Sequence, residues 1–135
     1  MTLEDLQKTY PGAVGFKFGD SRELNAELIG LVRSGVKTAT CGAARDFNDD
    51  PDDMPLQGHC DVVLDWDGVP QLVVETVEVT RQRFCDVPED FAVAEGEGTY
   101  DDWRRGHEAY FGRNGGFDPE MELICERFRV VEDLR

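Results

Sequence analysis

Long apolar runs are missing from this sequence of 135 residues. No stretch approaches the roughly 20 apolar residues that a membrane-spanning helix needs, so we expect no membrane association. The N-terminal segment is acidic, whereas a secretory signal begins with basic residues followed by an apolar stretch. The sequence therefore predicts a cytoplasmic protein.

Closely spaced cysteines are also missing. The four cysteines lie far apart, and none forms a CxxC pair, so the spacing of a zinc finger or a thioredoxin-like motif is excluded. In a cytoplasmic protein such cysteines are typically reduced and buried, which is the state that we predict. A metal site that combines His59 and Cys60 with another ligand is the less favoured alternative, and the prediction is that no metal or cofactor is bound.

Positive charge is scarce, and lysine above all. The sequence has 29 acidic and 14 basic residues, a net charge of −15, and lysine only at positions 8, 17 and 37. Affinity for nucleic acids comes mostly from neutralising phosphates, so a surface this acidic should repel a long polyanion. Two interpretations stay open: a nucleotide-sized ligand in a locally basic pocket, or an acidic surface that only aids solubility.

Periodicity, together with capping residues at Thr2, Ser21 and Thr99, predicts the order α-β-α-β-β-β-α-α-β, in which several strands follow one another. Such an order favours an α+β fold around a curved or closed sheet, and the length fits one domain over residues 1–135. Asp67-Gly68 is typical of a two-residue hairpin turn, and the acidic segment 46–54 is expected to be a mobile loop. The predicted core residues are Val62, Leu64, Val73 and Phe128, with Leu24, Leu28 and Leu31 of a helix over 21–34.

Lys37 and Thr40 form the first candidate site, directly after that amphipathic helix. A desolvated lysine can lose its proton, which arginine cannot do, and a threonine hydroxyl can act as a nucleophile. On one regular strand the two side chains would point to opposite faces, so a shared site needs a bend near Lys37. The alternative is a solvated lysine that only follows a helix cap. If the site is catalytic, we expect replacement of Lys37 by alanine to abolish turnover but to leave stability nearly unchanged, because a solvent-facing lysine contributes little to folding.

The second candidate is the segment Glu95-Gly-Glu97-Gly98, and the third is the helix that carries Trp103 and His107. Glycines on both sides of an acid indicate a tight turn or a close approach of the backbone; the alternative is a helix end followed by a flexible acidic turn. Trp103 and His107 lie one helical turn apart, where they could stack on a nucleobase, although aromatic residues at this spacing are more often part of the core.

Several segments, spread over nearly the whole length in order, together match one family. They are Phe18-Gly-Asp-Ser21, Ser34-Gly-x-Lys37-Thr-Ala-Thr40, Asp67-Gly-x-Pro70, Glu75-Thr-x-Glu78-Val79, Phe91, Glu95-Gly-Glu-Gly98, Trp103-Arg-x-x-His107 and Met121-x-Leu-x-Cys-Glu-Arg-Phe128-x-Val-Val131. The chain resembles the full-length, single-domain bacterial branch of the ASCH-domain family. That resemblance implies a PUA-like fold, a small mixed β-barrel flanked by helices, with a cleft at the Gly-x-Lys segment for RNA or a nucleoside.

The resemblance also implies roles for individual residues. One related class hydrolyses the amide of N4-acetylcytidine with a threonine, a lysine and a glutamate, and these roles fall on Thr40, Lys37 and Glu95. Around them, the residues expected to bind substrate are Thr38, Glu97, Tyr100, Trp103 and His107. The chain departs from that class at Gly42, where the class has an arginine, which puts the identity of the substrate in question.

Two classes of function therefore remain open. In the first, the protein is a hydrolase of a modified nucleoside or RNA, in which Thr40 attacks the acyl carbon and either Lys37 or Glu95 accepts its proton. In the second, it is a non-catalytic domain that binds RNA or a nucleotide; a ribonuclease is a further alternative. The expected partner is a small nucleoside or nucleotide, or a short RNA, and the net charge favours a small neutral nucleoside.

Overall fold

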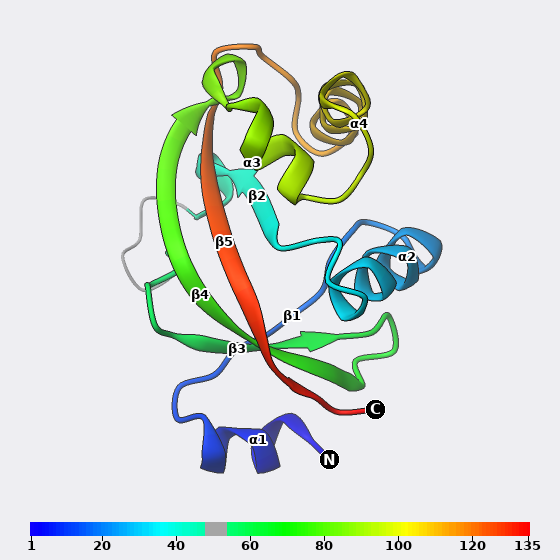
Figure 1. The fold of residues 1–135 in the computed structure, drawn as a ribbon, viewed down its shortest axis with the longest axis vertical. Coiled ribbons are helices and arrows are strands. Elements are labelled where there is room, and N and C mark those ends of the chain that lie inside the picture. Colours follow the sequence, from blue (N-terminus) through cyan, green and yellow to red (C-terminus); the bar gives the residue numbers. More distant parts are fainter. Residues whose placement is uncertain (48–53) are drawn as a thin grey trace.

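The helices and strands follow the predicted order along the chain (Figure 1). The computed structural model describes residues 1–47 and 54–135. Its helices are α1 (Leu3–Thr9), α2 (Arg22–Arg33), α3 (Glu89–Ala94) and α4 (Tyr100–Arg113), with short 3-10 helices η1 (Ala44–Phe47) and η2 (Phe84–Asp86). Its strands are β1 (Gly15–Phe16), β2 (Ala39–Ala43), β3 (Cys60–Leu64), β4 (Pro70–Arg83) and β5 (Glu122–Asp133).

Three of the helices begin at the predicted capping residues. The side chains of Thr2, Ser21 and Thr99 each accept a hydrogen bond from the backbone N–H three residues further on. At Thr2 and Thr99 the acidic residue at that position also accepts a bond from the cap's own N–H, which completes a capping box. Local sequence therefore fixes where α1, α2 and α4 start.

The strands form one sheet in the order β1-β3-β4-β5-β2, and only the β1–β3 pair is parallel. The predicted barrel is wrong, because the sheet is open: within the described residues, β1 and β2 are its two edges. The strand β1 pairs with β3 over only two residues, Gly15 and Phe16, and in the described part of the chain it does not pair with β2. The long, curved strands β4 and β5 nevertheless bend the sheet around toward these edges (Figure 1).

The two local predictions about loops need correction. Asp65 donates its N–H to the carbonyl of Val69 and accepts from the N–H of Gly68, so three residues, not two, form the hairpin loop, with Gly68 at φ 84°. Of the segment 46–54, Asp46 and Phe47 belong to η1 rather than to a loop. The prediction for residues 48–53 lies outside the described residues.

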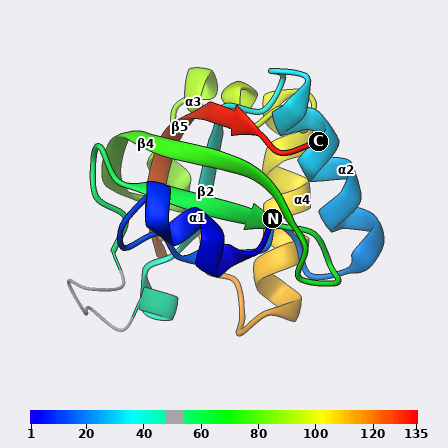
Figure 2. The same ribbon diagram turned by 90° about the horizontal axis from the view of Figure 1, so that it is seen from below.

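Helices cover both faces of the β3–β4 part of the sheet. Val62 packs in a cluster with α1, whereas its neighbour Val63 packs in a cluster with α2, because successive residues of a strand point to opposite faces. Figure 2 shows α2 and α4 on one side of the sheet and α1 on another. Burial is confirmed for Val62, Val73, Phe128 and Leu28, while Leu24, Leu31 and Leu64 are only partly buried.

A further cluster joins α3 and α4 to β2 and β5 around the buried Trp103 and Phe111. All four cysteines are free, as predicted, but only Cys125 is fully buried and Cys85 is exposed. Across residues 1–47 and 54–135, none of the helices is long and apolar enough to span a membrane.

Candidate functional site

The end of α2 directs Lys37 into the protein. Gly35, at φ 84°, reverses the chain after the helix, and the N–H groups of Val36 and Lys37 both donate to the carbonyl of Leu31. Lys37 therefore precedes β2 instead of lying on it, which supplies the bend that a shared site with Thr40 requires. Only 2% of Lys37 is exposed, so the solvent-facing alternative is wrong.

The end of α3 brings Glu95 to the same place. Glu95 is the last residue with helical angles, and Gly96 follows at φ 78°. A Cβ atom at Gly96 would lie 3.0 Å from the carbonyl oxygen of Val36 and 3.1 Å from Cα of Lys37. The two backbones thus touch at a position where only glycine fits. The adjacent N–H of Thr38 donates to the carbonyl of Ala94 at 2.7 Å, which fixes the contact.

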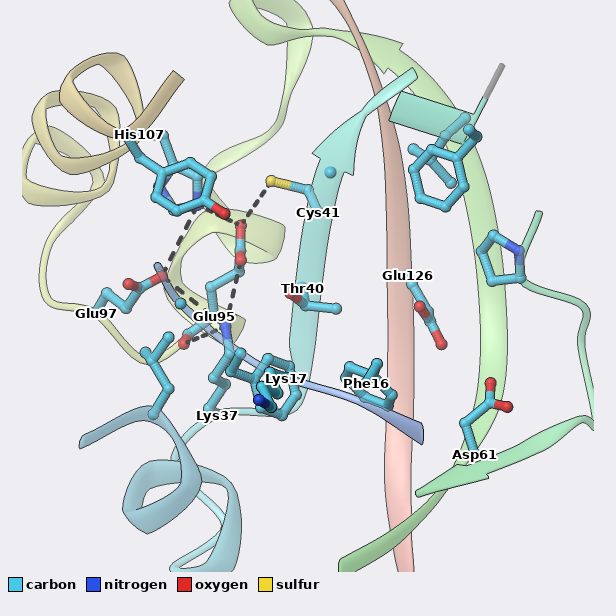
Figure 3. A pocket seen from close by; sticks show the side chains of 18 of the residues that line it. Phe16, Lys17, Lys37, Thr40, Cys41, Asp61, Glu95, Glu97, His107 and Glu126 are labelled. Atoms are coloured by element: carbon cyan, nitrogen blue, oxygen red, sulfur yellow. Dashed lines mark hydrogen bonds and ion pairs between the residues drawn. The ribbon is translucent and has the colours of Figure 1, made fainter. Parts of the chain in front are cut away.

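Lys37 and Glu95 form a buried ion pair (Figure 3). Nζ of Lys37 lies 3.3 Å from Oε1 of Glu95 and 3.3 Å from its backbone oxygen. The second oxygen, Oε2, accepts a hydrogen bond from the Trp103 indole at 2.5 Å and one from the Cys41 thiol at 3.3 Å. Burial would raise the pKa of Glu95, but the charge of Lys37 and the contacts with His107 and Trp103 outweigh burial and lower the pKa to about 2. Glu95 is therefore a permanent carboxylate.

His107 completes the cluster. Its Nδ1 lies 2.9 Å from the carbonyl oxygen of Trp103, an acceptor, so Nδ1 carries a proton. Its Nε2 faces the carboxylates of Glu95 at 3.5 Å and Glu97 at 3.9 Å. Burial opposes the charged imidazolium, but the hydrogen bond and the charge of Glu95 overcome burial and raise the pKa of His107.

Glu97 is the more accessible carboxylate of the cluster. Its side chain is 27% exposed, and Nζ of Lys37 lies 3.9 Å away. Burial raises the pKa of Glu97, although the charges of Lys37 and His107 act in the opposite direction. The pKa of Glu97 is thus shifted in the opposite direction to that of Glu95, and Glu97 is the more readily protonated of the two carboxylates.

The cluster lines a pocket of about 690 Å³, and Thr40 lies on its wall. Figure 3 shows Thr40 on β2, with the Lys37–Glu95 cluster on one side and Glu126 and Asp61 on the other. In the described part of the chain, the Thr40 hydroxyl makes no hydrogen bond with Lys37 or Glu95. The pocket occupies the gap between the edges of the open sheet, since residues of β1 and β2 both line it. The three residues predicted to be catalytic thus share one pocket.

The predicted substrate-binding residues divide into two groups. Glu97 and His107 line the pocket, whereas Thr38, Tyr100 and Trp103 do not. Trp103 is 1% exposed and stacks between Phe84 and His107. Tyr100 packs against the same cluster and donates its hydroxyl to the carbonyl of Val87, and Thr38 faces solvent. Stacking of a base on Trp103 is therefore wrong, because this ring is buried in the core, whereas Tyr100 is partly buried and lies outside the pocket.

The prediction from sequence missed Cys41 and Glu126. Cys41 follows Thr40 on β2, and Glu126 lies opposite Thr40 in the β2–β5 register. Glu126 accepts a hydrogen bond of 2.5 Å from Thr76, and burial raises its pKa. Only the pairing of β2 with β5 places Glu126 at the pocket, and periodicity alone does not reveal that pairing.

Among the described residues, one group in the pocket combines metal-ligand residue types. Donor atoms of Cys41, Glu95 and His107 all lie within 4.8 Å of one another. The alternative centred on His59 and Cys60 is less complete: His59 pairs with Asp61 at 3.3 Å.

Comparison with known proteins assigns the family. The model of the ASCH domain family matches residues 15–132. The crystal structure of an ASCH domain from Lactobacillus crispatus JV V101 is 29% identical, with a TM-score of 0.83 over 94% of this chain and 84% of that chain. A protein of known structure from Enterococcus faecalis V583 is 32% identical, with a TM-score of 0.81 over 95% and 84% of the two chains.

A more distant structure shares the fold. A mutant of an ASCH protein from Zymomonas mobilis is 12% identical, with a TM-score of 0.56 over 91% of this chain and 71% of that chain. Among curated proteins there is no match.

Proposed function

The chain belongs to the ASCH domain family, and on that basis we propose that it is a hydrolase that removes an acyl group from a small modified nucleoside. The observation that carries the proposal is the buried Lys37–Glu95 pair, which opens on a pocket of about 690 Å³. Burying two charges costs desolvation energy, so such a pair is weak evidence for stability and a good indicator of a functional site. The volume lies in the range of small-molecule sites, roughly 300–1,000 Å³.

The charges around the pocket favour a neutral ligand. Glu97, Glu126 and Asp61 line it in addition to the Lys37–Glu95 pair, and so do Lys17 and Arg113. The opposite charges of the lining nearly balance, so the pocket holds no excess positive charge for a phosphate group, and the net charge of −15 of the whole protein repels one. An acylated nucleoside without phosphate, such as the N4-acetylcytidine used by the related class, meets this requirement.

Gly42 indicates that the ligand differs from the ligand of the related class, which has an arginine at this position. A Cβ atom at Gly42 would lie 3.2 Å from the ring of Phe47. Both residues line the pocket, so an apolar ring occupies the space that a longer side chain at position 42 would need. An apolar wall suits an acyl chain better than a charged group.

The geometry suggests a role in the reaction for each residue. Thr40 attacks the acyl carbon, and the ammonium of Lys37 stabilises the oxyanion that forms. Glu95 is a positioning residue that holds Lys37, because a carboxyl group with a pKa of about 2 is a poor base. Glu97 accepts the threonine proton and gives it to the leaving amine. Water then hydrolyses the Thr40 ester, which releases the carboxylic acid and restores the hydroxyl.

The test is turnover of acylated nucleosides, with the free nucleoside detected by chromatography. We expect Thr40→Ala to abolish turnover and Thr40→Ser to retain part of it. Thr38→Ala, which changes a threonine outside the pocket, should leave turnover unchanged. Lys37→Arg should lose activity on the order of 100-fold, as removal of one oxyanion-stabilising donor does, because the larger guanidinium does not fit the buried position.

The binding alternative makes a different prediction. If no acylated nucleoside is turned over and the protein instead binds short RNA at equilibrium, the domain is a non-catalytic RNA-binding module. Cleavage of that RNA would indicate a ribonuclease. Either result, with the folded protein verified by circular dichroism, would refute the proposed amide hydrolysis.

A further inference from the structure

A thiol, a carboxylate and an imidazole meet on one side of the pocket. They come from three separate elements: Cys41 from β2, Glu95 from the end of α3 and His107 from α4. All three residues line the pocket. We propose that Cys41, Glu95 and His107 bind one divalent transition-metal ion, zinc by preference, whose fourth position is open to the pocket.

The distances between the donor atoms fit a tetrahedral ion. Zinc bonds of about 2.0–2.3 Å at tetrahedral angles place two ligand atoms about 3.3–3.6 Å apart. Oε2 of Glu95 lies 3.3 Å from Sγ of Cys41 and 3.5 Å from Nε2 of His107. The remaining pair, Cys41 with His107, is within 4.8 Å.

Neighbouring groups already orient the ligands as they do in zinc sites. A zinc-binding histidine usually donates its other ring N–H to a carbonyl or carboxylate, and Nδ1 of His107 does so toward Trp103 at 2.9 Å. The Trp103 indole occupies one lone pair of Oε2 of Glu95, and Lys37 holds Oε1. Oε2 also accepts the hydrogen bond from the Cys41 thiol, and this acceptor position becomes available to a metal ion when the thiol loses its proton.

The ligand types select the metal. Binding replaces the thiol proton of Cys41 and the Nε2 proton of the charged His107 ring, and both protons pass to solvent, so that His107 binds through Nε2 while a thiolate and a carboxylate together neutralise a divalent ion. Thiolate and imidazole ligands favour zinc, whereas magnesium and calcium prefer oxygen ligands alone. Three protein ligands with an open fourth position are typical of catalytic rather than structural zinc. The expectation that the chain binds no metal rested on the missing CxxC spacing, which does not apply to ligands from three separate elements.

The experiment is a titration of the full chain with Co²⁺ after removal of bound metal by a chelator. We expect one Co²⁺ per chain, a thiolate-to-cobalt charge-transfer band, the intense visible bands of a four-coordinate site, and displacement of the cobalt by Zn²⁺. Cys41→Ser should abolish the charge-transfer band. Absence of that band in the wild-type protein would overturn the proposal.

Two matched variants locate the site. Cys125→Ser changes the residue opposite Cys41 in the β2–β5 register, and Cys60→Ser tests the alternative next to His59. Both should keep the charge-transfer band and bind Zn²⁺ as the wild type does, whereas His107→Gln should weaken Zn²⁺ binding by at least the 10–100-fold typical of losing an outer-shell contact. Loss of the band in Cys60→Ser together with its retention in Cys41→Ser would place the metal elsewhere and refute the proposal.

X-ray absorption of the wild-type zinc complex needs no variant. We expect one sulfur neighbour at about 2.3 Å among four ligands, the others being nitrogen or oxygen. No sulfur, or two sulfurs, would refute the site even if Cys41→Ser failed to fold. None of these measurements depends on turnover, so the metal site and the proposed hydrolase can fail independently.

Discussion

At the scale of single residues, the burial of Lys37 changes what its replacement should do. A side chain that is 2% exposed, paired with a carboxylate that is 1% exposed, leaves an uncompensated buried charge when one partner is removed. We expect Lys37→Met to lower the free energy of unfolding by about 3 kcal/mol, measured by urea denaturation at pH 7. The prediction from sequence that replacing Lys37 leaves stability nearly unchanged is therefore wrong, because it assumed a solvent-facing side chain.

Lys17 provides the matched control, because it also lines the pocket but is exposed. Lys17→Met should lower the free energy of unfolding by less than about 1 kcal/mol. The double variant Lys37→Met/Glu95→Gln should regain part of the loss, since it removes the unpaired charge. Equal losses for the two lysine variants would show that the ion pair contributes nothing to folding.

Glu95 should make stability depend on pH in acid. Its pKa is about 2 in the folded protein against 4.5 ordinarily, so the folded state favours the carboxylate. The resulting stability is fully present above pH 4.5 and is lost as the pH falls toward 2. One such shift corresponds to about 3 kcal/mol. The difference in unfolding free energy between wild type and Glu95→Gln should therefore shrink over this interval.

Glu126 offers a control of opposite sign. Burial raises its pKa, so the folded state favours the protonated carboxyl, and this group adds stability as the pH falls. The difference in unfolding free energy between wild type and Glu126→Gln should move in wild type's favour as the pH falls through the raised pKa toward 4.5, above the interval in which the Glu95 difference shrinks. Parallel behaviour of the two variants would contradict the assignment of Glu95 as a permanent carboxylate.

At the scale of elements, the contact between the ends of α2 and α3 depends on Gly96. A Cβ atom there would lie 3.0–3.1 Å from backbone atoms of Val36 and Lys37, and φ is 78°. At Gly35, φ is 84° but no atom lies within 4 Å of such a Cβ. Gly35→Ala should therefore lower the free energy of unfolding by about 1 kcal/mol, because of the backbone angle alone. Gly96→Ala should lower it by a further amount of about 1–3 kcal/mol, because the added Cβ is overpacked.

Turnover should also differ between the two glycine variants. Gly96→Ala must displace Lys37 from Glu95, so we expect it to lose activity as well as stability, whereas Gly35→Ala should retain activity. Denaturant unfolding together with kcat/KM for the acylated nucleoside checks both quantities. If the two variants lose stability equally, the close approach at Gly96 does not constrain the site.

The elements themselves were predictable where the signal is local. The capping residues Thr2, Ser21 and Thr99 lie within the sequence that they cap, and each begins its helix as predicted. Pairing between distant strands is not local. That is why Cys41 was interpreted as a core thiol and Glu126 was not noticed: the register that places both at the pocket joins β2 to β5, more than 80 residues later.

At the scale of the whole molecule, the open sheet explains why the site exists where it does. The curvature was predictable from the long strands, but closure depends on whether the edge strands meet, and β1 pairs over only two residues. The gap that remains between β1 and β2 is the pocket. Lys37, Thr40 and Glu95 were identified through family resemblance, whereas the burial of Lys37 and Trp103 depends on packing that no single segment encodes.

The net charge of −15 gives a prediction for the whole molecule. A protein that binds RNA through phosphate contacts loses affinity as salt increases, because counterions are released. The affinity of this acidic protein for anions should instead increase as salt increases, because salt screens their repulsion. For a neutral acylated nucleoside, kcat/KM should change less than about two-fold between 0.05 and 0.5 M NaCl, since no long-range charge interaction is screened.

For the same nucleoside carrying a 5′-phosphate, kcat/KM should be lower at low salt and should rise as NaCl screens the repulsion from the surface and from Glu97, Glu126 and Asp61. Glu126→Gln removes one of the pocket carboxylates, so it should reduce the difference in kcat/KM between the neutral and the phosphorylated nucleoside. Thr38→Ala, outside the pocket, should leave that difference as it is. A phosphorylated substrate that is preferred at low salt, and loses this preference as salt increases, would mean that Lys37 binds phosphate. The pocket would then belong to a nucleotide-binding domain and not to a hydrolase of neutral nucleosides.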